Sequence, residues 1–173
     1  AADEGEFIYI STAGDFLIHP GGLSILHEWL EKTAADAVIS PPQLHAPSLQ
    51  VRKTKASWPL FVFTDILQAY AAAVIPSPVA ARIQILSGAS GLTGSYASCL
   101  FRTSTLRQRP FPLNCHHYGD TAWLYRHLPD IRLAYCPTRV ARFEIHGGEL
   151  RRKVDKDQVY GLMMGLAEHL PEA

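Results

Sequence analysis

The sequence lacks long apolar runs, paired cysteines and an excess of charge of either sign. No run of about 18 apolar residues occurs in its 173 residues, so no membrane-spanning helix is predicted. Sixteen basic residues balance sixteen acidic ones. No summed field therefore attracts nucleic acid, and any phosphate must be recognised locally. The N-terminus lacks the basic and apolar regions of a signal peptide. Peripheral contact with a membrane stays open.

The three cysteines occur singly, without a C-x-x-C pair. This pattern argues against a disulfide framework or a thiolate zinc site, and it fits buried thiols in a reducing, cytoplasmic compartment. Oligomeric state leaves no signal in the composition.

The length and the 47% hydrophobic content fit one domain, residues 1–173, with a sizeable core. The order strand, helix, strand at residues 6–11, 23–35 and 37–40 predicts an α/β unit with a right-handed crossover. A loop is predicted at 43–59 and a helix at 61–75, followed by a short helical or irregular segment. The remaining predictions are strands at 96–101, 131–136 and 140–145, and helices at 121–128 and 158–170.

Asp15 ends the motif Ser11-Thr12-Ala13-Gly14-Asp15 directly after the first predicted strand. Rigid backbone at the edge of a sheet would hold this carboxylate, and ligands bind there in α/β folds. A single carboxylate suits Mg²⁺ or Mn²⁺, which fill their other positions with phosphate and water. The alternative is that Asp15 caps the turn or the helix that begins after Gly22.

Gly88, Gly91 and Gly94 are spaced three apart just before a predicted strand. Their backbone can approach a ligand closely and offer amide donors to an anion. The motif is neither a Walker loop nor a Rossmann fingerprint, because no Gly-Lys-Ser/Thr follows and no helix opens after it. The alternative is a flexible surface loop.

Asp120 precedes a helix that is expected to bury Trp123 and Leu124. A carboxylate near a helix N-terminus is favoured in its ionised form and can accept a proton at neutral pH. The alternative is an N-cap that accepts hydrogen bonds from amides near Ala122 or Trp123. The neighbouring His116 and His117 point to opposite sides of an extended segment, so both cannot easily face one metal.

His146 follows the last predicted strand and precedes two glycines. It can join a carboxylate as a metal ligand, and the alternative is a solvent-facing histidine. Arg151 and Arg152, with Lys153 beside them, can clamp a diphosphate. The alternative for this basic run is a solvated charged face.

Taken in this order, the motifs resemble the C-terminal two-thirds of a family-two glycosyltransferase of the GT-A fold, from Gly5 to His146. The resemblance implies a mixed sheet flanked by helices, without the N-terminal nucleotide-binding portion. Asp15 corresponds to the last aspartate of the metal-binding DXD motif, with Ala13 at the first. The segment from Gly88 to Gly94 looks like the glycine-rich loop that faces the sugars.

Gly119-Asp120 is similar to the family's Glu-Asp motif, whose aspartate is the general base, with glycine in place of the glutamate. His146 matches the histidine that supports the metal in many GT-A enzymes. The resemblance thus implies a Mn²⁺- or Mg²⁺-assisted, inverting transfer from a nucleotide-diphosphate sugar to the hydroxyl of a saccharide or lipid-linked acceptor. Asp120 would remove the proton, and the metal on Asp15 would offset charge on the departing diphosphate.

Two other classes of function remain for this sequence. A noncatalytic fragment or scaffold of the same descent is favoured by Ala13, by Gly119 and by the missing half. A metal-dependent hydrolase would use Asp15, Asp120, His146 and either His116 or His117. The hydrolase is the weaker alternative, because the ligands show no recognisable metal-binding spacing such as H-E-x-x-H.

Overall fold

The computed structural model describes residues 5–11, 15–45, 64–71, 73–87, 92, 96–113, 115, 119–144 and 156–170. Its strands are β1 (Phe7–Tyr9), β2 (Phe16–Leu17), β3 (Ala37–Ile39), β4 (Gln43–His45), β5 (Val74–Ile75), β6 (Cys99–Arg102), β7 (Leu133–Tyr135) and β8 (Ala141–Glu144). Its α-helices are α1 (Gly22–Thr33), α4 (Thr64–Gln68), α5 (Ser77–Ser87), α6 (Thr103–Gln108), α7 (Gly119–His127) and α8 (Lys156–Ala167). Two 3₁₀ turns, η2 (Tyr96–Ser98) and η4 (Leu128–Asp130), complete the described elements.

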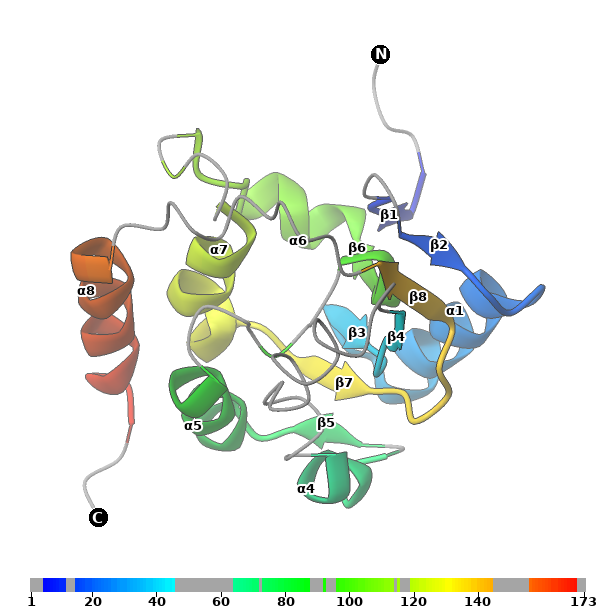
Figure 1. Cartoon of the computed structure of the whole chain (residues 1–173), viewed down its shortest axis with the longest axis horizontal. Helices are drawn as coiled ribbons and strands as arrows, with labels where there is room; N and C mark the ends of the chain where they lie inside the picture. The colour runs from blue at the N-terminus through cyan, green and yellow to red at the C-terminus, as the bar shows by residue number, and fades with distance from the viewer. Residues whose placement is uncertain are drawn as a thin grey trace.

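A five-stranded sheet in the order β1-β6-β3-β7-β5 forms the centre of the molecule (Figure 1). β3 pairs in parallel with β7, whereas β6 runs antiparallel to both β1 and β3. β1, β3 and β7 therefore run in one direction, and their carboxyl ends share one edge of the sheet with the start of β6. We call this edge the carboxyl edge.

A second, three-stranded sheet in the order β2-β8-β4 carries polar side chains on one face. The register pairs Arg142 with both Phe16 and Gln43, and Glu144 with His45. Side chains directly opposite each other, or two residues apart on one strand, point to the same face of a sheet. Arg142, Glu144 and His45 are thereby gathered on one surface, with Asp15 one residue before β2.

Helices cover both faces of the central sheet (Figure 1). On one face, Leu26 and Leu30 of α1 pack with Val38 and Leu100 of the sheet. The opposite face belongs to a separate core cluster, to which α5 and α7 contribute Ile83, Trp123 and Leu124 and the strands contribute Ile39, Phe101 and Tyr135. α8 packs against α7 and α5. This is the predicted mixed sheet flanked by helices, so the fold class is confirmed.

Most predicted elements are present within a few residues of their expected bounds, and two predictions are wrong. The helix expected at 61–75 is only the short α4 in its described part, and Val74 and Ile75 form strand β5 instead. These residues pair with Ala134 and Leu133 of β7, so sheet pairing overrides the helical pattern. Part of the loop expected at 43–59 is strand β4, which pairs with β8; residues 46–63 lie outside the described part.

The prediction of buried thiols is confirmed for Cys99, Cys115 and Cys136, each of which is buried. The predicted burial of Trp123 and Leu124 is confirmed as well. β2 and α6 were not predicted, because each is too short to show a period.

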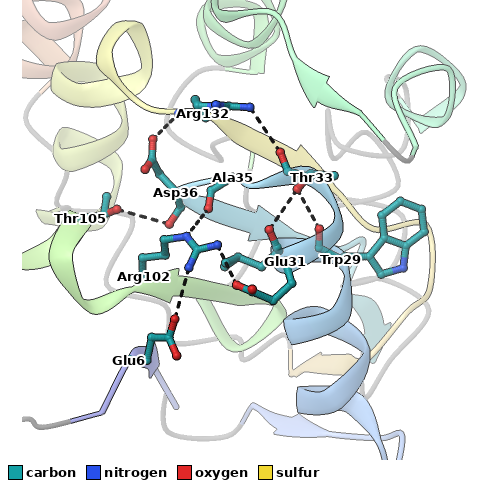
Figure 2. A network of polar contacts seen from close by, with 10 residues as sticks. Glu6, Trp29, Glu31, Thr33, Ala35, Asp36, Arg102, Thr105 and Arg132 are labelled. Atoms are coloured by element: carbon teal, nitrogen blue, oxygen red, sulfur yellow. Dashed lines mark hydrogen bonds and ion pairs between the residues drawn. The ribbon is translucent and has the colours of Figure 1, made fainter.

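Arg102 connects β6 to the C-terminal end of α1 and to β1 (Figure 2). Its Nε donates to the carbonyl oxygen of Ala35 at 2.9 Å, and its Nη2 lies 2.7 Å from the Glu31 carboxylate. Its Nη1 lies 3.7 Å from Glu6. The contacts to Ala35, at the entry to β3, place this network at the sheet edge opposite the carboxyl edge.

Replacing Arg102 by alanine is expected to lower the free energy of unfolding by about 1–3 kcal/mol, because a buried carbonyl and a carboxylate lose a charged donor. Urea denaturation measures the change. Arg132→Ala is the comparison, since its guanidinium makes one longer bond, 3.4 Å to the carbonyl oxygen of Thr33. An equal loss in the two variants would contradict the role given to the Arg102 network.

Candidate functional site

The carboxyl edge gathers polar residues from four of the five strands of the central sheet. Asp15 follows β1, Ser40 follows β3, Tyr135 ends β7, and Ser98 directly precedes β6. Ser40 is fixed to Ser98, since its backbone N–H and its hydroxyl both donate to the carbonyl oxygen of Ser98, at 2.9 and 3.2 Å. In open α/β sheets ligands bind outside the carboxyl ends of the strands. This edge is therefore the candidate functional site.

Asp15 is held by the second sheet. Its Oδ1 accepts a hydrogen bond from the backbone N–H of Glu144 at 3.1 Å. The helix after Gly22 does not use it as a cap, because the N-cap of α1 is Gly21 and α1 has no side-chain capping bond. The helix-capping part of that alternative is thus wrong, whereas the turn at residues 12–14 lies outside the described part of the chain.

Asp120 is exposed and lies in the first turn of α7. Its Oδ1 accepts from the backbone N–H of Thr121 at 2.6 Å, rather than from the amides of Ala122 or Trp123 that an N-cap would bind. Its backbone carbonyl accepts from the hydroxyl of Tyr96 at 3.0 Å. The carboxylate therefore lies at the positive end of the helix dipole.

An aromatic cluster fixes the start of α7 against β6. The ring of Tyr96 stacks on Phe101 with centroids 5.5 Å apart and meets Phe111 edge-on. Trp123 of α7 packs against both phenylalanines, and its Nε1 donates to the carbonyl oxygen of Arg109. Burial, and then the charge of Asp120, raise the pKa of Tyr96 well above its usual range. Tyr96 thus stays a neutral donor to Asp120.

The two candidate carboxylates approach the same part of the carboxyl edge. Burial, and then the charge of Asp120, raise the pKa of the Cys99 thiol at the start of β6. Burial, then Cys99, then Asp15 raise the pKa of Tyr9 at the end of β1. Cys99 therefore lies within electrostatic reach of Asp120, and Tyr9 within reach of both Cys99 and Asp15.

Glu144 joins the strands of the second sheet beside Asp15. Its Oε1 lies 2.8 Å from Nη2 of Arg142, and its Oε2 lies 2.7 Å from Nδ1 of His45. The hydrogen bond from His45 is the main cause that lowers the pKa of Glu144, and Arg142 adds to it. The guanidinium of Arg142 also lies 4.4 Å above the ring of Phe16.

Sequence reasoning missed His45 and Glu144 as site residues. The signal for Glu144 was its spacing of two from Arg142 within a predicted strand, which places both side chains on one face. His45 gave no such signal, because it was placed in a loop.

Eight of the predicted or candidate residues lie outside the described part of the chain. They are Gly88, Gly91, Gly94, His116, His117, His146, Arg151 and Arg152. Their roles stay predictions.

The described residues can bind a divalent cation only if phosphate and water supply most of its ligands. Over these residues, no group of three or more His, Cys, Asp or Glu side chains is placed to hold a metal ion. Mg²⁺ needs only one or two protein carboxylates when phosphate and water complete its coordination. Asp15 can supply one such oxygen, whereas the described residues offer no zinc-like cluster for a metal-dependent hydrolase.

None of the helices in the described part of the chain is both long enough and apolar enough to cross a membrane.

Comparison with known proteins supports the fold. No protein-family model matches the sequence, and no curated protein matches it. Among solved structures, the chain is similar to the crystal structure of S. aureus TarS residues 1–349 in complex with UDP-GlcNAc, with a TM-score of 0.61 and 13% sequence identity. The match covers 96% of this chain and 43% of the TarS chain. The chain thus has a glycosyltransferase-like fold and spans less than half of that relative.

Replacing Tyr96 by phenylalanine keeps the ring stacking and removes only the hydroxyl that donates to Asp120. We expect the free energy of unfolding to fall by about 1 kcal/mol and the amides at the start of α7 to exchange faster, as measured by hydrogen exchange. Tyr125→Phe is the matched control on the same helix, since its hydroxyl donates to the carbonyl oxygen of Gln84 at 3.2 Å. If both variants leave exchange at Asp120 unchanged, Tyr96 does not anchor it.

Proposed function

We propose that the chain is part of a nucleotide-sugar transferase that moves a sugar to an acceptor hydroxyl with inversion. The observation that carries the proposal is that Tyr96 of η2 is bonded to Asp120, while η2 packs against β8, which holds Asp15, at the end of a glycosyltransferase-like sheet. The finer assignment to family two rests on the order of the sequence motifs. Buried thiols favour a cytoplasmic location.

Asp120 is the proposed general base. Its exposed carboxylate lies in the first turn of α7, where an acceptor hydroxyl can reach it. It would take the proton of that hydroxyl while the oxygen attacks the anomeric carbon and the bond to the diphosphate breaks. The acceptor proposed is a saccharide or a lipid-linked saccharide.

Asp15 is the proposed contact to Mn²⁺ or Mg²⁺, with His146 as a further ligand. A divalent cation bound there offsets the negative charge on a departing diphosphate. The backbone N–H of Glu144 orients the Asp15 carboxylate before any ligand arrives. Gly88, Gly91, Gly94, Arg151 and Arg152 are proposed to contact the donor.

A noncatalytic scaffold is the second candidate, and one observation at Gly119 favours it. A Cβ atom at this position would lie 3.3 Å from the carbonyl oxygen of Pro112, which is tighter than ordinary contact. The glutamate of a Glu-Asp motif would therefore need the Pro112 backbone to shift. The packing here suits glycine, so the departure from the motif has a structural basis.

Calorimetric titration with UDP-GlcNAc and a panel of other nucleotide sugars, with and without Mn²⁺, separates the two candidates. The transferase proposal expects manganese-dependent binding of at least one donor, followed by sugar transfer to an acceptor. A folded chain that binds none of them would support the scaffold. Circular dichroism and a cooperative melting transition establish that the chain is folded.

A further inference from the structure

Two hydrogen-bond donors are buried without a partner where η2 packs against the second sheet. The hydroxyl of Ser98 and Nε of Arg142 are both inaccessible to solvent, and neither makes a hydrogen bond to the protein. The other such atom among the described residues is the hydroxyl of Tyr135, a residue that pairs with Ile39 of β3. Buried polar groups are nearly always satisfied, so each exception requires a physical reason.

Ser98 is held firmly through its backbone. Its carbonyl oxygen accepts both bonds from Ser40, while its own side chain is fully buried. Its turn, η2, packs against both β8 and β2 of the second sheet. Ser98 therefore lies where the central sheet meets β8, which carries Arg142, and β2, which begins directly after Asp15.

Arg142 is held on two sides. Its Nη2 pairs with Glu144, and its guanidinium plane covers the ring of Phe16. Phe16 is opposite Arg142 in the register, and Asp15 directly precedes it. These contacts fix the guanidinium, while its Nε–H is left without an acceptor.

We propose that Ser98 and Arg142 are diphosphate contacts, which donate hydrogen bonds to phosphate oxygens of a nucleotide diphosphate bound beside Asp15. An arginine donates only, so its missing partner must be an acceptor, and a phosphate oxygen forms a charge-assisted bond with it. The positive charge of Arg142 also favours a phosphate oxygen over the neutral hydroxyls of a sugar. The inference rests on the proposed function and assigns Arg142, to which the sequence motifs gave no role.

The test measures binding of inorganic pyrophosphate and of UDP by calorimetry, with and without Mn²⁺. Ser98→Ala and Arg142→Lys are each expected to weaken binding about tenfold. Lysine keeps the charge and loses the planar fork with its Nε–H. Thr33→Ala, which removes a buried hydroxyl at the C-terminal end of α1, and Arg139→Lys are the controls, and both are expected to bind as the wild type does.

Thermal melting supplies a readout that is independent of any ligand. Ser98→Ala removes an unpaired buried hydroxyl and is expected to keep or raise the melting temperature, whereas Ser40→Ala removes a bonded one and is expected to lower it. An equal loss in the two variants would show that the hydroxyl of Ser98 already has a partner, which overturns the inference.

The outcomes separate this inference from the proposed transferase. If pyrophosphate binding falls in both variants but no sugar is transferred by the wild type, the diphosphate contacts stand and the transferase fails. If sugar is transferred and both variants bind pyrophosphate normally, the transferase stands and the contacts are refuted. A wild-type chain that binds neither pyrophosphate nor UDP also refutes them.

Discussion

Asp120→Asn is expected to slow sugar transfer by about 10²–10⁴-fold, the contribution usual for a positioned general base. Asparagine is nearly isosteric and its amide oxygen can still accept from the N–H of Thr121. The backbone bond from the hydroxyl of Tyr96 is also kept. The loss should therefore appear in kcat, with donor binding and the melting temperature close to those of the wild type.

Asp130→Asn controls for the removal of one negative charge, because Asp130 lies in η4, which follows the opposite end of α7. It should transfer sugar at the wild-type rate. If Asp120→Asn retains more than about a tenth of the wild-type kcat, Asp120 is not the base. The carboxylate that accepts the proton would then lie elsewhere at the carboxyl edge.

Local patterns predicted most of the fold. Residues 23–35 repeat apolar side chains at helical spacing, and α1 buries Leu26 and Leu30 as that pattern requires. The strand at 6–11 was readable from its β-branched and aromatic residues. Val74 and Ile75 were misread because their strand depends on β7, about 60 residues later in the chain, and no local period reports a distant partner.

The candidate site was only partly predictable for the same reason. Asp15 and Asp120 stand out because each follows or begins a recognisable element. The contacts that hold them were not readable: the Tyr96 hydroxyl bonds a residue 24 positions away, and Glu144 contacts Asp15 across 129 positions. His45 and Glu144 are separated by 99 positions, and only the register of β4 on β8 brings them together.

Asp15→Asn is expected to weaken manganese-dependent binding of a nucleotide sugar by at least about 100-fold, since even the outer-shell partners of metal ligands contribute about 10–100-fold. An asparagine oxygen can still accept from the N–H of Glu144, so the fold of the second sheet should be kept. What it loses is the negative charge, which is the property that a hard divalent cation requires. The free energy of unfolding should therefore change by less than about 0.5 kcal/mol.

A comparison of Asp15→Ala with Asp15→Asn separates the effect of the negative charge from the effect of the hydrogen bond to Glu144. Alanine removes both, leaves the N–H of Glu144 without its acceptor, and is expected to destabilise the chain by about 1 kcal/mol more than asparagine does. If charge on Asp15 recruits the cation, the two variants bind the donor equally poorly in Mn²⁺ and differ only in stability. If Asp15→Asn binds like the wild type while Asp15→Ala does not, Asp15 acts by holding β8 in place, and the cation would have to be held by other residues.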